Sequence, residues 1–440
     1  MSKTQPKQTK QNVQVKLSQY YALIKENVTL PEYKAIRDMS IGILKSESVI
    51  NLKMAYSLND KVTPKKTCER FTRHLNKKEL GPKLQNSIIE KQCRGIDHDT
   101  AIIVDDSDIV KPYAKQMEGL QRIRDGSTGR VDQLGYNLVN IIAFQGQGES
   151  YAIKPLSSDL IAQDIDPDGL FYTTQDRLVQ IILESRNKGV FVFDRGYDKR
   201  SMFNFVKDNG CNYIIRSTGR RGLIVDGQEK SFNEVAKSVK LTHNYSLKNK
   251  GQNLKCGIKR VGIRLNPHPV KHPEAVETWL IVARYSKDKK GREGYFYLLC
   301  DFPGQLNLSL EQIIFKALKM YRMRWKIEEV HRHIKQCYGW EKIQLTSYTR
   351  LQNMNQILLL TMCFLYSLKK YAHLYLEAFP SIMRYDNKSW KKIYAFVYYK
   401  LTELLEVCFR SVGRYNICPY KGKWNEGNQL IIPCLKNGGI

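Results

Sequence analysis

The sequence predicts a mixed α/β protein: a sheet flanked by helices, interrupted by a β-rich insertion and bracketed by helical regions. Three observations support this prediction. Apolar strand patterns alternate with helical patterns in the second quarter of the chain, strand patterns alone follow, and helical patterns fill both ends. We therefore expect five regions, at residues 1–95, 96–217, 218–310, 311–370 and 371–440.

Composition narrows the class of partner. The 440 residues, 42% hydrophobic, are enough for two or three cores. Lysine and arginine number 71 against 43 acidic residues, so the formal net charge of +28 favours a polyanion, with nucleic acid as the default. An anionic membrane surface is the rival, but the longest apolar run, 357–368, is too short to span a bilayer.

The N-terminus and the cysteines indicate a cytosolic protein. No apolar secretory signal opens the chain, and the segment MSKTQPKQTKQ reads as a disordered basic tail. Ten cysteines without a C-x-x-C pair argue against a zinc ribbon or a disulfide framework. The histidines form no rich cluster, so we expect no histidine-based metal site.

The first region is helical in pattern. A helix over 46–57 precedes a second one, which opens at Thr63-Pro64 with threonine as N-cap and proline at the first helical position. Two short helices with a basic second member suit a helix-turn-helix in a DNA groove. An ordinary helical bundle with a basic surface explains the pattern equally well.

The next two regions carry the strands. Elements of the first part of the core are expected as a strand from Ala101, a hairpin (137–144 and 150–155), a helix (174–187), a strand (190–194), a helix (199–208) and a strand (211–216). Alternating segments at 278–285 and 294–301 predict an antiparallel insertion. Helices are expected at 310–338, 348–372 and 389–410.

The helix at 310–338 carries a polar face. Its segment YRMRWKIEEVHRHIK places five polar side chains on one side and apolar residues on the other, while Glu329 lies off the polar line. An amphipathic surface helix with charge pairs is the plain alternative. The five polar residues are Tyr321, Arg324, Glu328, Arg332 and Lys335.

Two aspartates end apolar strands. Asp194 closes VFVFD and Asp106 follows AIIVD, where sheet proteins place ligands. With Glu328 they supply three oxygen donors suited to two Mg²⁺ or Mn²⁺ ions and hence to phosphoryl transfer. Strand-end aspartates often cap turns instead. Asp105 and Asp108 also compete with Asp106, and strand alternation places Asp105 on the opposite face.

These motifs resemble one family. The spacing of Tyr321, Arg324, Glu328 and Lys335 is similar to the Y-(2)-R-(3)-E-(6)-K signature of the insertion-sequence-4 family of DDE transposases. FVFDRGYDKR resembles the second-aspartate motif of that family and IIVDDSDIVKPYAK the first, in which the ligand precedes Ser or Thr; this favours Asp106. The resemblance implies an RNase H-like core interrupted by a β-rich insertion.

The resemblance also implies roles. Asp106, Asp194 and Glu328 would be catalytic and hold two Mg²⁺ or Mn²⁺ ions, while Tyr321, Arg324 and Lys335 would contact DNA phosphates. Arg332 shares their face, although the signature omits it. Trp279, on an insertion strand, would stack on a flipped base near the transposon end, whereas most strand tryptophans are core residues.

The implied activity is DNA transposition. Relatives cut and paste their element through a hairpin intermediate, acting on terminal inverted repeats and target DNA, and pairing two ends implies a homodimer in the synaptic complex. A bacterial or archaeal cytoplasm, with nucleoid association, is the expected setting. Two alternatives stay open: a catalytically inactive or repurposed DNA-binding protein, and an RNase H-like nuclease or resolvase without strand transfer.

Overall fold

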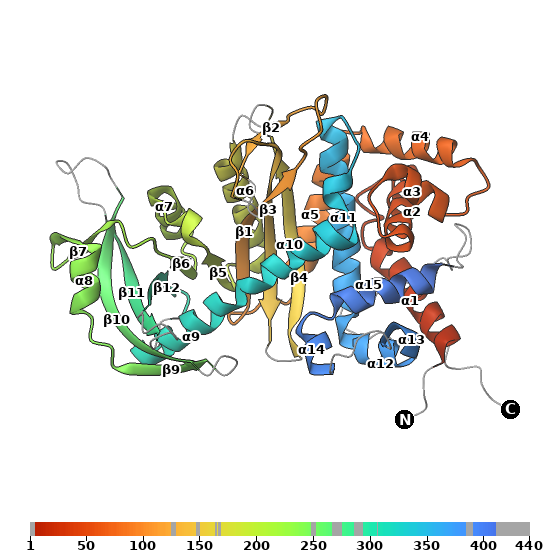
Figure 1. The fold of residues 1–440 in the computed structure, drawn as a ribbon. Helices are drawn as coiled ribbons and strands as arrows, with labels where there is room; N and C mark the ends of the chain where they lie inside the picture. Colours follow the sequence, from red (N-terminus) through yellow and green to blue (C-terminus); the bar gives the residue numbers. More distant parts are fainter. Residues whose placement is uncertain are drawn as a thin grey trace.

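The protein is an elongated mixed α/β molecule (Figure 1). The insertion forms one end, the sheet of the core lies in the middle, and the N- and C-terminal helices form the other end. The computed structural model describes residues 5–124, 129–146, 150–162, 165, 169–247, 252–265, 275–285, 294–305, 307–383 and 390–410. The expected tail residues 1–4, part of the hairpin turn (147–149) and the C-terminal 411–440 lie outside the described residues.

Five strands form the core of the sheet. Strand β3 pairs antiparallel with both β4 and β1, and β1, β5 and β6 are parallel to one another. This arrangement confirms the predicted mixed sheet and is consistent with an RNase H-like fold. A short strand β2 (Gln121–Ile123), which we did not predict, also pairs with β3. The five strands are β1 (Ala101–Val110), β3 (Gln133–Gln145), β4 (Ala152–Ile161), β5 (Val190–Phe193) and β6 (Tyr213–Arg216).

The insertion continues the same sheet. Strand β12 (Tyr295–Asp301) pairs antiparallel with β6, and β11 (Ala275–Tyr285) and β10 (Gln252–Arg264) follow in order. The expected antiparallel pairing of the insertion strands is therefore confirmed, and backbone hydrogen bonds join the insertion to the core. Its remaining elements are β7 (Gly222–Val225), β8 (Gln228–Ser231), α8 (Phe232–Ser238) and β9 (His243–Leu247).

The N-terminal helices correct one expectation. Helix α1 (Pro6–Ala22) begins inside the segment that we expected to be a disordered tail. Pro6 suits the first helical turn, and Val13, Leu17 and Tyr21 recur on one buried face, so packing stabilises a polar sequence as a helix. The others are α2 (Leu30–Ser46), α3 (Asn51–Ser57), α4 (Pro64–Leu75) and α5 (Leu80–Cys93).

Helix α4 forms as its sequence predicts. The side chain of Thr63 accepts a hydrogen bond from the backbone N–H of Lys66, and Pro64 occupies the first turn. The helix contacts both α2 and α3. The preceding helix is shorter than expected, because α3 begins at Asn51 while residue 46 ends α2.

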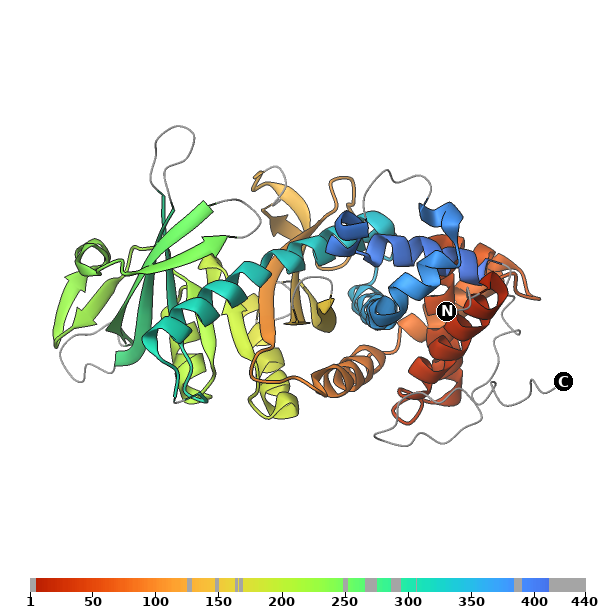
Figure 2. The same cartoon turned by 90° about the horizontal axis from the view of Figure 1, so that it is seen from below.

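The expected helix over 310–338 is divided at Arg324. Helices α9 (Leu310–Met323) and α10 (Trp325–Cys337) meet there, and the amides of Arg324 and Ile327 bond to carbonyls three residues earlier. Figure 2 shows the pair running diagonally from the insertion to the C-terminal helices. The helices not yet named are α6 (Gly169–Ser185), α7 (Arg200–Asp208), α11 (Tyr348–Ser367), α12 (Ala372–Glu377), α13 (Pro380–Met383), α14 (Trp390–Ala395) and α15 (Tyr398–Phe409).

Two apolar clusters cover the two faces of the sheet. Strand β1 alternates between them: Ile103 and Ile109 pack in the cluster that contains residues of α9, α10 and α11, whereas Ile102 and Val104 pack in the cluster of α6 and α7. Helix α11 is buried along most of its length. Among the described residues, no helix has the length and apolarity needed to cross a membrane.

Candidate active site

The strand register brings two aspartates to one edge of the sheet. Val104 of β1 pairs in parallel with Phe193 of β5, so the residues that follow each, Asp105 and Asp194, lie at the same edge. Helix α10 packs across this edge and carries Glu328. Three carboxylates from distant parts of the sequence are thereby gathered around one point, as parallel strand ends predict.

The guanidinium of Arg324 joins these three carboxylates. Its Nη2 donates to Oε1 of Glu328 at 2.9 Å and its Nη1 to Oδ2 of Asp105 at 3.3 Å, while Oδ2 of Asp194 lies 4.0 Å from Nη1. The Arg324 side chain is only 9% exposed. Although burial disfavours its charge, the surrounding carboxylates raise the pKa of Arg324.

Tyr321 closes the site on the other side of Asp194. Its hydroxyl donates to Oδ1 of Asp194 at 3.2 Å and accepts from Nη1 of Arg216 at 3.5 Å. Arg216 ends β6, the strand beside β5. Sequence reasoning missed Arg216, although a basic residue that ends an apolar strand at the same sheet edge was the available signal.

Asp105, rather than Asp106, faces this group. The two point to opposite faces of β1, whose pairing with β3 has no register shift, and Asp105 follows the phase of Ile103, which packs with α10. Asp106 instead accepts a hydrogen bond from the hydroxyl of Tyr197, on the face of α7. The geometry therefore favours Asp105 over the predicted Asp106 as the partner of Asp194 and Glu328.

Burial dominates the electrostatics of Asp105. Desolvation raises the pKa of its carboxyl to about 7; Arg324 opposes this, and the negative charges of Asp106, Asp194 and Glu328 add to it. The carboxyl thus lies among like charges that a bound cation would relieve.

Two more predicted site residues lie farther along α10. Lys335 lies 3.5 Å from Oδ2 of Asp108 and 3.2 Å from Oε1 of Glu341, so it stays near β1 but away from the three carboxylates. Arg332 is exposed, and its charge acts on Tyr399 of α15. The structure therefore brings Tyr321, Arg324 and Glu328 together and leaves Arg332 outside the group.

The insertion tryptophan lies apart from the carboxylates. Followed across β12 and β6, the strand register places Trp279 level with Val192, two residues before Asp194. Three strand spacings separate the two strands, about 14 Å. The ring is half-buried, with the Arg260 guanidinium 5.0 Å from its centre. Its stacking on a flipped base stays a prediction.

A different tryptophan borders the site. Trp325 is 66% exposed, and its ring centre lies 5.7 Å from the guanidinium carbon of Arg324. Sequence reasoning passed over this residue. Its position directly after Arg324, off the apolar stripe of the helix, was the signal that could have identified it.

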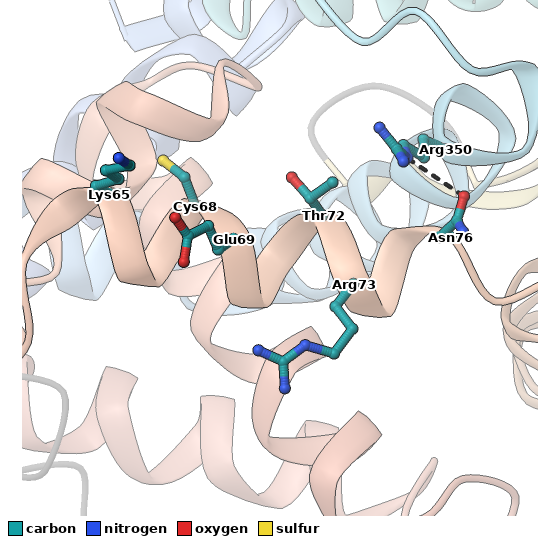
Figure 3. A pocket seen from close by; sticks show the side chains of 7 residues that line it. All are labelled: Lys65, Cys68, Glu69, Thr72, Arg73, Asn76 and Arg350. Atoms are coloured by element: carbon teal, nitrogen blue, oxygen red, sulfur yellow. Dashed lines mark hydrogen bonds between the residues drawn. The ribbon is translucent and has the colours of Figure 1, made fainter.

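A second basic surface lies on α4. Figure 3 shows an open pocket along this helix, lined by Lys65, Glu69, Arg73 and Asn76 and, from α11, by Arg350. Nε of Arg350 donates to Oδ1 of Asn76 at 3.3 Å, which ties the end of α4 to α11. The exposed face of the predicted second helix of the helix-turn-helix is therefore hollowed and carries the cations Lys65 and Arg73.

Comparison with known families supplies the class of protein. A family model described as the transposase DDE domain matches residues 98–364, more than half of the chain. The chain belongs to the transposase DDE domain family. The matched segment includes β1, β5 and α10 and therefore all three gathered carboxylates. No curated protein gives a significant match.

Membership of the DDE family accounts for the donor set. Enzymes of this family are nucleases and transposases that act on DNA and typically use divalent metal ions. The oxygen donors Asp105, Asp194 and Glu328 suit Mg²⁺ or Mn²⁺. Among the described residues, however, no group of three acidic, histidine or cysteine side chains is close enough to hold an ion, and the Arg324 guanidinium lies among the three carboxylates.

Proposed function

We propose that this protein is a DNA transposase of the insertion-sequence-4 type, which cleaves the ends of its element and joins them to target DNA. The observation that carries the proposal is the gathering of Asp105, Asp194 and Glu328 in a chain of the transposase DDE domain family. Its spacing of Tyr321, Arg324, Glu328 and Lys335 supports the YREK subclass.

The proposed roles follow the geometry. Asp105, Asp194 and Glu328 hold the divalent ions, which when bound supply the activation of water or a 3′-hydroxyl and the stabilisation of the leaving oxygen. Tyr321 orients Asp194 through its hydrogen bond, and Arg324 contacts the phosphate of the cleaved strand. Lys335 neutralises a neighbouring phosphate. Asp105 replaces Asp106 in this assignment.

Adjacent aspartates provide a matched test of the assignment. We expect Asp105→Asn to reduce cleavage of an end duplex at least a thousandfold in Mg²⁺, and Asp106→Asn to retain most of it, since Asp106 faces Tyr197. Gel analysis of labelled strands measures both. Loss of cleavage in Asp106→Asn alone would return the assignment to Asp106.

The cut-and-paste route is tested with the protein's own DNA. Purified protein is incubated with duplexes carrying the inverted repeats that flank its gene, Mg²⁺ and a supercoiled target plasmid. We expect nicks, then hairpins on the element ends, then joined products. Nicks without hairpins contradict the hairpin route, and cleavage without joining indicates a nuclease.

We assign recognition of the ends to the N-terminal helices, with α4 against the duplex. The support is the cation-rich face of α4 in Figure 3 and the net charge of +28. Replacing Lys65 and Arg73 by Ala should weaken binding of the end duplex at least tenfold without metal. The control is Lys25→Ala, which removes an exposed cation of the same region outside α4.

Two copies are proposed for the active complex. Joining both ends of an element in one event requires a catalytic site at each end, and each chain offers one group of three gathered carboxylates among its described residues. Light scattering with and without end duplex tests this. A complex with DNA that holds one chain per pair of ends would contradict it.

A further inference from the structure

The guanidinium of Arg324 lies among the three carboxylates of the candidate site. One guanidinium bridges Asp105, Asp194 and Glu328 at 3.3, 4.0 and 2.9 Å. It thus occupies the space between the oxygens that the proposed function gives to metal ions. In the described part of the chain, no group of three such side chains is close enough to hold an ion while the guanidinium lies among them.

A divalent ion and this guanidinium compete for the same carboxylates. Both are cations that need the same lone pairs, and at about 4 Å their repulsion is strong wherever water is partly excluded. The site is of that kind, because the side chains of Arg324 and Asp105 are 9% and 15% exposed. Entry of the ion therefore requires the guanidinium to leave.

The departing guanidinium needs a new anion. Arg324 gives up three carboxylates, and leaving it buried without a partner would be costly. A phosphodiester is the anion that a DNA-cleaving site receives, and its two free oxygens match the guanidinium fork. The exposed ring of Trp325, 5.7 Å away, lies on the outer side of Arg324 and offers a surface against which the group can rest outside the site.

We propose that Arg324 keeps the metal site closed in the free protein and is drawn out by a DNA phosphate, so that DNA and divalent ions bind cooperatively. This inference rests on the proposed function, since it needs ions at these carboxylates. The free protein then carries an internal cation in place of its metal. Because coupling between two ligands is reciprocal, DNA raises ion affinity by the same factor by which ions raise DNA affinity.

The first experiment measures Mn²⁺ binding to the full chain without DNA, by electron paramagnetic resonance. We expect Arg324→Gln to bind Mn²⁺ at least tenfold more tightly than the wild type, which corresponds to about 1.4 kcal/mol. The control Arg322→Gln removes the same charge from an exposed position two residues away and should change the affinity less than twofold. Equal or weaker binding by Arg324→Gln would overturn the proposal.

The second experiment uses only the wild-type protein, so its result cannot be affected by a variant that fails to fold. Wild-type protein is titrated with a pre-cleaved end duplex, which has no bond left to cut, with and without Mn²⁺. We expect at least tenfold tighter DNA binding with Mn²⁺, and the same factor for Mn²⁺ with DNA. Identical DNA affinities in the two conditions would refute the inference.

The two proposals fail differently. If Mn²⁺ and DNA bind cooperatively but the protein never cleaves the ends of the element, the proposed function is contradicted and the inference is supported. Cleavage that depends on Glu328, with independent binding of Mn²⁺ and DNA, keeps the proposed function and removes the inference.

Discussion

The two faces of α10 differ in whether their polar side chains are hydrogen-bonded inside the protein, and two histidines show the difference. On the core face, Nδ1 of His333 bonds to the hydroxyl of Tyr366 at 3.0 Å and Nε2 to that of Thr402 at 2.9 Å. On the face toward β1, Nε2 of His331 has no hydrogen-bond partner among the described residues. Burial lowers the pKa of both rings to about 3, so both are neutral at pH 7.

The polar groups of one face therefore contribute to stability, and those of the other face can bind a ligand. Polar groups of the core face are paired inside the protein, and they can only lose partners when altered. On the site face, three carboxylates share one guanidinium and therefore keep capacity for a ligand. Variants of the site face should thus change function with little change in stability, and variants of the core face the reverse.

The largest expected effect is at Glu328. Glu328→Gln should reduce end cleavage at least a thousandfold, because a neutral amide is a poor metal ligand, while the free energy of unfolding changes by less than about 1 kcal/mol. The control is Glu329→Gln: Glu329 pairs with Lys326 at 2.7 Å, away from the aspartates, and its loss should leave cleavage within threefold. Cleavage assays and urea unfolding measure the pair. Cleavage by Glu328→Gln at the wild-type rate would break the comparison.

Local sequence patterns were sufficient for most of the fold. The run AIIV predicts a buried strand because both faces of β1 are covered, and Thr63-Pro64 predicts the start of α4 because capping is a local interaction. Helix phase likewise separated Glu328 from Glu329. These features depend on neighbours within a few residues, which a single sequence contains.

Features that depend on distant contacts were not predictable. Alternation on the strand showed that Asp105 and Asp106 differ in face, but only the packing of α10 against β1 shows which face carries the site. Helix projection groups Arg332 with Glu328, whereas in the structure Arg332 is exposed and its charge acts on Tyr399 of α15. The ordering of residues 6–11 in α1 depends on contacts of that helix with α15.

The second effect tests the core face. His333→Ala should lower the free energy of unfolding by about 3 kcal/mol, since it opens a cavity and removes the hydrogen bonds that the hydroxyls of Tyr366 and Thr402 make to the ring. The protein that remains folded should bind Mn²⁺ and DNA as the wild type does. Urea unfolding gives the stability and a DNA titration the binding. An unchanged midpoint would show that the paired imidazole is not structural.

Lys91 is an exception to the pairing of polar groups in the core. Its Nζ has no hydrogen-bond partner among the described residues and lies 3.1 Å from the centre of the Tyr20 ring. Burial lowers the pKa of Lys91 to about 7, whereas the unfolded value is about 10.4. Between these two pKa values the unfolded chain binds more protons than the folded chain does. This residue therefore makes the free energy of unfolding rise with pH from about 7 to 10.

The test replaces Lys91 by Met, which keeps the length and removes the charge. We expect Lys91→Met to be more stable than the wild type by about 2 kcal/mol at pH 6.5, a value below the full linkage cost because the Tyr20 ring stabilises the ammonium. The difference should shrink as the pH rises to 9.5. Urea unfolding at the two values measures it, and an equal difference at both would show that the lysine is neutral or solvated throughout.

The smallest effect concerns the aromatic residues of the two faces. Aromatic rings pack around His333 on the core face, whereas Trp325 on the site side is 66% exposed. Trp325→Ala should leave the free energy of unfolding within about 0.5 kcal/mol and weaken binding of an end duplex by about 1 kcal/mol, because an exposed ring beside Arg324 has a face available for a base. Trp390→Ala, at a partly exposed ring on α14 that stacks on His373, is the matched control and should not alter DNA binding. Equal DNA affinities of Trp325→Ala and the wild type would mean that the site face contacts DNA through charges alone, and the ring would then serve only to shield Arg324 from water.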